Sequence, residues 1–405
     1  MRILFIHQNF PGQFLHLAPA LAARGHDVLA LTDAANTRPR VVRTLCYPSP
    51  DGPEVPGLAR TYARACDRGH RVARACAALD AQGYRPEVIF AHGGWGEPLF
   101  LREVWPDVRI LTYAEFFYRS TGLDAGFDPE FSTDSLGARL STTARKAHLL
   151  MALQDADAAL SPTEFQASTF PEPLRQKIAV IHDGVDTDVL RPDPQACFDL
   201  PGGPTLRPGD EVLSFVARNL EPYRGYHLFM RGLPAVLAAR PEAQVVIVGA
   251  DGQSYGGRPE SGSWRDRFLE EVAGRIDRSR VHLVGRITHA RFVALMQVTR
   301  VHAYLTYPFV LSWSMIEAMA AGALVVGSAT PPVEEVIRDG VNGRLVPFFD
   351  IDGWSHALIG ALADPAAQAP LRRAARDTAR ARYDLKTVCL PRLIDFVESA
   401  DIRRA

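Results

Sequence analysis

The sequence lacks most features of secreted, membrane-spanning or nucleic-acid-binding proteins. Its 405 residues include only five cysteines, without the paired spacing that binds metals. No uninterrupted apolar run reaches the roughly 18 residues of a membrane span, and the N-terminal segment turns polar at His7, too early for a signal peptide. The 45 basic and 46 acidic residues nearly cancel, so a nucleic-acid partner is not expected. These absences favour a cytoplasmic protein in a reduced compartment.

What the sequence does contain is a regular alternation of short apolar strands and amphipathic segments. It opens with the strand RILFI, a helix over about 13–23 and the strand HDVLAL. Further strands are expected at 87–92, 108–113, 158–161, 178–186, 211–218, 243–252, 280–287, 301–307 and 323–329. This pattern predicts an α/β fold with two Rossmann-like domains, each built on a parallel sheet.

A segment rich in proline and glycine separates the two halves. Residues 193–210, DPQACFDLPGGPTLRPGD, show no periodicity and have the composition of an interdomain connection. We therefore expect a first domain over 1–195 and a second domain over 205–384.

Loops that follow strands are the expected ligand sites of parallel sheets. In HQNFPGQF, Gly12 would let the backbone approach a ligand, although a plain βα turn is an alternative. His92 ends the strand before GGWGE, where it is either a cleft acid–base group or a structural histidine. Glu115 lies among aromatic residues, where it either accepts a hydrogen bond from a substrate or pairs with an arginine such as Arg119.

The second half carries the stronger signals for an anion. Arg218 and Arg224 flank a turn at a predicted helix start, a placement suited to a diphosphate, although a pair of surface arginines is the alternative. Two glycine-ended strands, VIVGADG and LVGRI, could bring Arg286 and Ile287 to a nucleotide base.

The segment YLTYPFVLSWSMIEAMAAG joins a buried strand to a helix that is expected to end at Gly322. Ser312 and Ser314 offer hydroxyls for the helix cap, and Glu317 lies in the first turn. A helix N-terminus of this kind binds anions through backbone N–H groups. Residues expected to offer these groups are Ser312, Trp313, Ser314 and Met315, with Glu317 accepting from ribose hydroxyls.

The chain resembles the retaining family 4 glycosyltransferases of GT-B fold in a series of motifs. They run in order as PGQF, HGGWGE, IHDGVDTDVLRP, RNLEPYRGYHLFMRGLP, VIVGADG, LVGRI, SWSMIEAMAAG and EEVIRDGVNGRLV. The resemblance implies two domains facing across a cleft, with a nucleotide-sugar donor held by the second domain and a saccharide, lipid-linked or small-molecule acceptor held by the first. It also implies transfer with retained configuration and a last helix within 385–405 that packs back on the first domain. Because Arg218, Arg224 and the helix start at 314–316 would supply fixed positive groups, no metal or other cofactor is expected.

The resemblance assigns roles to several residues and is broken at one. Arg218 matches the diphosphate arginine, and Arg224 stands where such enzymes more often have lysine. Glu317 matches the second of a pair of glutamates, whereas Phe309 occupies the place of the first. In the first domain Glu115 and His92 compete for the group near the anomeric carbon. Gln13 would supply an amide to the sugar or acceptor.

Two other functions are compatible with these motifs. Phe309 favours a nucleotide-sugar-binding protein that has lost turnover, and a sugar-nucleotide epimerase would share the diphosphate site.

One further feature is a cationic helix face. The helix predicted over 58–79 places five arginines on one side. This is either a solvated face or a contact for an anionic lipid surface or charged acceptor, the former leaving the protein wholly cytoplasmic and the latter peripheral at the membrane. The arginines are Arg60, Arg64, Arg68, Arg71 and Arg74.

Overall fold

The structure, a computed structural model, describes residues 1–52, 54–132 and 135–399. These form two compact units. The first comprises Met1–Asp183 and Cys389–Ala405, and the second comprises Gly184–Val388.

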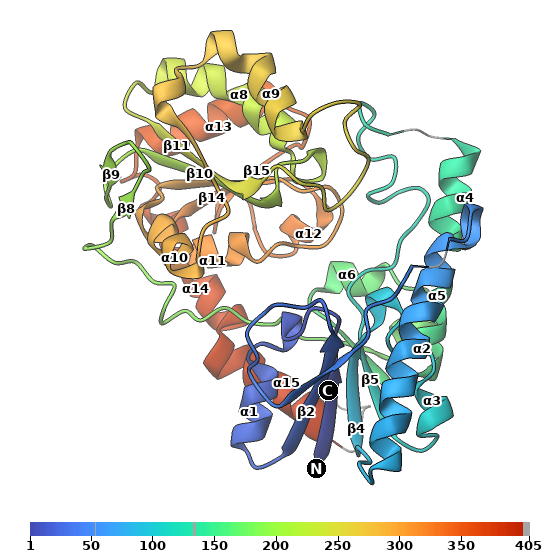
Figure 1. The fold of residues 1–405 in the computed structure, drawn as a ribbon. Coiled ribbons are helices and arrows are strands. Elements are labelled where there is room, and N and C mark those ends of the chain that lie inside the picture. Colours follow the sequence, from blue (N-terminus) through green and yellow to red (C-terminus); the bar gives the residue numbers. More distant parts are fainter. Residues whose placement is uncertain (53, 133–134, 400–405) are drawn as a thin grey trace. The chain divides into compact units, whose positions relative to one another are not determined.

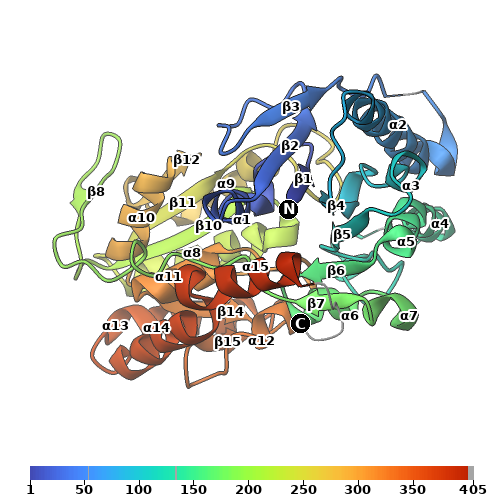
Figure 2. The same cartoon turned by 90° about the horizontal axis from the view of Figure 1, so that it is seen from below.

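The first unit is built on a parallel sheet of seven strands in the order β3-β2-β1-β4-β5-β6-β7 (Figure 2). Since the order reverses between β1 and β4, the loops after these strands begin at the switch point where parallel sheets bind ligands. The strands are β1 (Arg2–Ile6), β2 (Asp27–Asp33), β3 (Thr44–Tyr47), β4 (Val88–His92), β5 (Arg109–Tyr113), β6 (Ala158–Ser161) and β7 (Ile178–Val180).

Both faces of this sheet are covered by helices, which explains why its strands are almost wholly apolar. Along β1, Ile3 and Phe5 pack in a core with α1 and α15, whereas Leu4 and Ile6 pack on the opposite face with α2 and α3. The helices are α1 (Leu17–Ala23), α2 (Arg60–Ala81), α3 (Leu101–Val104), α4 (Leu136–Ala144), α5 (Ala147–Asp155), α6 (Glu164–Ser168), α7 (Glu172–Arg175) and α15 (Leu390–Glu398).

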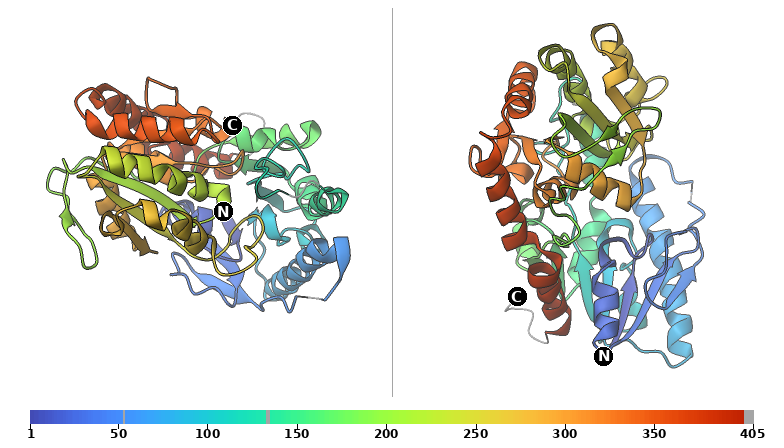
Figure 3. Two further views of the ribbon diagram at one scale, coloured as in Figure 1. Left: turned by 90° about the horizontal axis from the view of Figure 1, so that it is seen from above. Right: turned by 90° about the vertical axis from the view of Figure 1, so that its left-hand side faces the viewer.

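The second unit repeats this plan with a parallel sheet of six strands in the order β12-β11-β10-β13-β14-β15. Its switch point lies between β10 and β13. Figures 1 and 3 show α8, α9 and α13 on one face and α10, α11 and α14 on the other. The strands are β10 (Val212–Asn219), β11 (Gln244–Ala250), β12 (Val281–Gly285), β13 (Val301–Tyr304), β14 (Leu324–Ser328) and β15 (Arg344–Val346). The helices are α8 (Tyr226–Ala239), α9 (Trp264–Val272), α10 (His289–Val298), α11 (Ser314–Ala321), α12 (Pro331–Glu334), α13 (Ile351–Ala363) and α14 (Ala369–Tyr383).

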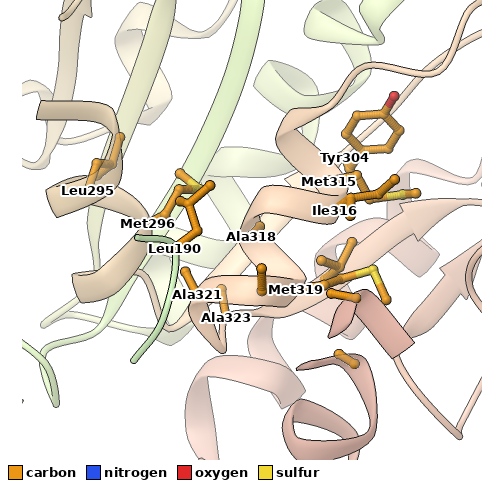
Figure 4. Close-up of a cluster of buried hydrophobic side chains, with 14 of the residues drawn as sticks. Leu190, Leu295, Met296, Tyr304, Met315, Ile316, Ala318, Met319, Ala321 and Ala323 are labelled. Carbon is orange, nitrogen blue, oxygen red and sulfur yellow. The ribbon is translucent and has the colours of Figure 1, made fainter. Parts of the chain in front are cut away.

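Helix α11 lies in the middle of the second unit's core. Figure 4 shows Met315, Ile316 and Met319 of this helix in the same apolar cluster as Leu295 and Met296 of α10. Gly322 then ends the helix with φ +86°, a conformation that residues with a Cβ rarely adopt. The first turn of α11 is therefore held by packing on several sides.

Two features differ from the sequence-based expectations, and one expectation is covered only in part. Residues 193–210 include a small hairpin, β8 (Phe198–Asp199) and β9 (Thr205–Leu206), and Phe198 and Leu206 are buried in the core of the second unit, so this segment belongs to that unit. The short strands β3 and β15 were not predicted. The last residues of the predicted 385–405 helix, 400–405, lie outside the described residues.

None of the described helices has both the length and the apolar character needed to cross a bilayer.

Candidate functional site

Two loops of the second unit meet at its switch point. The loop after β10 contains the short 3₁₀ helix η4 (Pro222–Arg224), and the loop after β13 runs to the start of α11. The N–H of Tyr307 donates to the carbonyl of Tyr223 at 3.1 Å and joins the two loops. We call the residues gathered around this junction the Arg224 cluster: Arg218, Glu221, Tyr223, Arg224, Tyr255, Thr306 and Phe309.

Arg224 is the buried centre of this cluster. Its Nη1 donates to Thr306 Oγ1 and to the carbonyl of Val310, both at 2.9 Å. The guanidinium also lies 5.5 Å from the ring centre of Tyr255 and 6.0 Å from that of Phe309. All of these contacts are with uncharged groups. They orient the guanidinium without forming an ion pair, so its charge can act on an anion, although the buried Glu221 lies close enough to interact with it.

Glu221 is buried between the two arginines and was missed in the sequence, although an acid inside NLEPYR was a usable signal. Its Oε2 accepts hydrogen bonds from the N–H groups of Ser254 and Tyr255, at 3.1 and 3.0 Å. Burial raises the pKa of Glu221, and these hydrogen bonds and the nearby Arg224 and Arg218 act against that shift. Glu221 therefore fastens the loop after β11 to the Arg224 cluster.

Arg218 and the start of α11 supply the remaining positive groups. Arg218 is exposed at the end of β10, and within the described part of the chain its guanidinium makes no hydrogen bond or ion pair. The predicted hydroxyl cap of α11 is wrong: Trp313 occupies the cap position and no side chain caps the helix. Ser314 is the first helical residue, while the N–H of Ser312 donates to the Tyr304 hydroxyl at 2.7 Å. The N–H groups of the first turn are thus left for a ligand.

The other predicted residues of the second unit have simple placements. Met315 has its side chain in the core, so only its backbone can reach a ligand. Trp313 is exposed. Arg286 is exposed directly after β12, while Ile287 packs against the core of the unit.

Glu317 is partly buried in the first turn of α11. Within the described residues its carboxylate accepts no hydrogen bond, and burial raises the pKa of Glu317 to about 7. Because burial penalises the charged form, the ionised group gains most from a ligand that donates hydrogen bonds.

A pH dependence follows from this shift. Between its ordinary pKa near 4.5 and about 7, Glu317 keeps a proton in the folded protein that it loses in the unfolded chain. Stability therefore falls as pH rises through this range, and we expect Glu317→Gln to make the fall shallower in thermal unfolding at pH 5 to 8. Burial also raises the pKa of Glu97 in the first unit to about 7. Glu97 therefore contributes a second fall in stability over the same pH range, which Glu317→Gln does not remove. An unchanged slope in Glu317→Gln would contradict the assignment.

The first unit has its own cluster of polar groups at the switch point, which we call the His7 cluster: His7, Gln13, His92 and Glu115. The Asn9 N–H donates to His7 Nδ1 at 2.8 Å, so in the neutral ring the proton is on Nε2. Nε2 then donates to Gln13 Oε1 at 2.9 Å, and Gln13 Nε2 donates to Glu115 Oε1 at 3.2 Å. Burial lowers the pKa of His7 to about 4, so the ring is neutral at neutral pH and these donor and acceptor roles are kept. His7 was missed in the sequence, where its only signal was a polar residue directly after the first strand.

The structure gives His92 and Glu115 different chemical characters. His92 is fully buried, its ring stacks on Trp95 with centres 4.3 Å apart, and its Nδ1 accepts from the Gly94 N–H at 3.0 Å. Burial, with a smaller contribution from His7, lowers the pKa of His92 well below its usual value, so the ring is neutral. Its Nε2 is a buried donor with no hydrogen-bond partner among the described residues. Glu115, in contrast, accepts a hydrogen bond from the side-chain amide of Gln13.

The His7 cluster requires a glycine at position 12 for a steric reason. Its φ is +48°, and a Cβ at this position would lie 2.5 Å from His7 Nε2. Only glycine therefore allows His7 to reach Gln13.

Asp-x-Asp, a sequence that can bind a divalent metal, occurs at 155–157, 186–188 and 350–352, and in each case an aspartate has a structural contact. Asp157 binds Arg102, Asp186 and Asp188 bind Lys386, and Asp350 caps α13. Among the residues that the structure describes, no three metal-binding side chains come together.

Comparison with solved structures identifies the class of fold. Sucrose-phosphate synthase from Thermosynechococcus elongatus superposes with a TM-score of 0.69 at 20% identity and covers 97% of both chains. Anabaena HepE, solved in complex with UDP-glucose, superposes with a TM-score of 0.68 at 16% identity and covers 98% of both chains. The two parallel sheets and these neighbours define a GT-B fold.

Sequence comparison then identifies the family. Residues 24–190 match the model of the glycosyl transferase family 4 group, and residues 203–382 match that of glycosyl transferases group 1. The chain belongs to the family 4 glycosyltransferases. A phosphatidyl-myo-inositol mannosyltransferase from Mycolicibacterium smegmatis is 30% identical over 49% of this chain and 48% of its own length. A D-inositol 3-phosphate glycosyltransferase from Mycolicibacterium paratuberculosis is 29% identical over 53% of this chain and 46% of its own. The match thus spans about half the length of these relatives.

Proposed function

We propose that the protein is a retaining glycosyltransferase. It would move a hexose-type sugar from a nucleotide diphosphate sugar to a glycan, lipid-linked or small-molecule acceptor. The observation that carries this proposal is the Arg224 cluster, in which a buried guanidinium with neutral hydrogen-bond partners lies beside the loop leading to the open N-terminus of α11. These are the groups that a diphosphate requires.

The chemistry of transfer explains why positive groups matter most. As the bond to the sugar breaks, negative charge develops on the departing diphosphate. Arg224 and Arg218 would stabilise that charge, and the first-turn N–H groups of α11 would add hydrogen bonds. Glu317 would accept hydrogen bonds from the ribose.

The comparisons support the choice of donor and acceptor. HepE is solved with UDP-glucose, and the curated relatives are named for transfer to inositol-containing acceptors. In the first unit, the neutral His92 would donate a hydrogen bond from Nε2, while Glu115, oriented by Gln13, would accept one from a sugar or acceptor hydroxyl. Retention would follow if the leaving phosphate itself takes the acceptor's proton on the same face.

Phe309 favours a second candidate, a binding protein without turnover. Its side chain is buried and meets Tyr255 edge-on with ring centres 4.7 Å apart, so an apolar contact replaces an acid at this position. The arginines and Glu317 would still bind a nucleotide.

Thermal unfolding with UDP, GDP and ADP, followed by assays for sugar release from the corresponding donors, distinguishes the two. For the transferase, one nucleotide is expected to raise the melting temperature by several degrees, and its sugar donor to be hydrolysed or transferred. Arg218→Ala should abolish most of that shift, whereas Arg275→Ala, at an exposed arginine outside the cluster, should not. A shift without sugar release, with a panel of acceptors present, would favour the binding protein. No shift with any nucleotide would contradict both.

A further inference from the structure

Exposed apolar side chains gather on one part of the first unit. Helix α4 buries none of its residues, and Leu136 and Leu140, one helical turn apart, are 63% and 46% exposed. Leu58, in the turn before α2, is 49% exposed, and Leu150 and Met151 of α5 are 40% and 37% exposed. Where such side chains form one contiguous surface, that surface is a candidate contact for a protein or a membrane.

These residues come from segments that lie side by side. Helix α4 packs beside the turn Gly57–Ala59 that precedes α2, as Figures 1 and 3 also show. The Tyr62 hydroxyl of α2 lies 3.0 Å from the Met151 sulfur of α5. The start of α2 thus connects α4 to α5, and we call this surface the α4 patch: Leu58, Arg60, Arg64, Leu136, Leu140, Leu150 and Met151.

The same segments are strongly cationic. Residues 55–66 and 135–153 contain no aspartate or glutamate, in a chain whose acidic and basic residues are otherwise balanced. Their basic residues are Arg60, Arg64, Arg139, Arg145 and Lys146. Arg145 and Lys146 lie over the rings of Tyr118 and Phe117, contacts that leave their charges un-neutralised. The flanking Asp67 is already paired with Arg71.

The structure also shows which arginines of the predicted cationic face of α2 are paired and which are exposed. Arg71 is bound to Asp51 and Asp67, and Arg68 donates to the carbonyl of Trp95 at 3.5 Å. Arg60 and Arg64 are exposed, at the end of the helix that lies beside α4. Arg74, further along α2, is also exposed, so two of the three exposed arginines of this face lie next to the exposed leucines.

We propose that the α4 patch docks the first unit on an anionic lipid bilayer. The leucines enter the boundary between headgroups and acyl chains, and Arg60 and Arg64 bind lipid phosphates. Charge complementarity selects this occupant. A second copy of the chain would bring the same arginines against each other, which opposes pairing through this surface. The proposal does not depend on the transferase activity, because docking needs no nucleotide.

Flotation with lipid vesicles tests the proposal on the full chain. The protein is expected to float with vesicles of phosphatidylglycerol and phosphatidylcholine but not with pure phosphatidylcholine, and to be released partly by about 0.5 M salt. The double variants Leu136→Ser/Leu140→Ser and Arg60→Glu/Arg64→Glu should each weaken binding at least tenfold. Leu45→Ser/Arg43→Glu changes exposed residues of the same kinds on and beside strand β3 and should bind like the unchanged protein.

Several results would overturn the proposal. One is failure of the unchanged protein to bind the anionic vesicles. Another is that both patch variants bind the anionic vesicles as tightly as the unchanged protein does, while their thermal unfolding also matches that of the unchanged protein. A third is sedimentation showing a dimer that Leu136→Ser/Leu140→Ser converts to a monomer, since the patch would then be an interface between copies.

Discussion

Arg224→Ala is expected to lower the rate of sugar transfer by about 10²–10³-fold, the usual effect of removing one charge-stabilising group from an active site. The variant loses the positive charge nearest the centre of the cluster. It also loses the hydrogen bonds to Thr306 and Val310 that hold the loop before α11. Steady-state kinetics with the donor identified by thermal unfolding would measure kcat and KM separately.

Two further variants separate charge from loop structure. Arg224→Lys keeps the charge but loses the planar geometry, so an intermediate loss is expected. Thr306→Val keeps the arginine and removes one neutral hydrogen bond, and should cost little turnover. If Thr306→Val were as damaging as Arg224→Ala, Arg224 would act by holding the loop and not by stabilising the leaving group.

Gly96→Ala is expected to destabilise the first unit strongly, because the added methyl group has no room. Gly96 has φ +104°, and a Cβ there would lie 2.3 Å from the carbonyl oxygen of Ala65 in α2. Strain at positive φ and the clash with a backbone atom together should cost about 2–5 kcal/mol. We expect the first unit's melting temperature to fall by about 10 °C.

Gly126→Ala is the matched control for this experiment. Gly126 lies in the same unit with φ +78°, and a Cβ there meets nothing within 4 Å. It should therefore show only the backbone strain, about 1–2 kcal/mol. Equal losses of unfolding free energy in the two variants would show that the close approach of α2 to the loop after β4 contributes little to stability. Because that loop directly follows His92, Gly96→Ala should lower activity more than Gly126→Ala does.

Several strands and site loops could be predicted because their signals are local. An apolar run such as RILFI or AALS has the length of a buried strand, and each is found at its predicted position. Parallel topology then directs attention to the loops that follow. Local signals failed where packing decides: residues 193–210 have the composition of a linker, yet Phe198 and Leu206 are buried, and hydroxyl residues precede α11, yet none caps it.

The sequence by itself determined the α/β class, the positions of most strands and the loops where chemistry would lie, because these depend on residues close together in the chain. Only the tertiary structure decided which polar groups meet. Gln13 joins His7 to Glu115, and Glu221 holds the loop of Ser254 and Tyr255. The contacts of Gln13 with Glu115 and of Glu221 with Ser254 and Tyr255 connect loops that follow different strands, whose distances depend on the order of those strands in the sheet. The role of each buried carboxylate or imidazole depends on those contacts, since burial sets the cost of charge and neighbouring donors decide whether that cost is met.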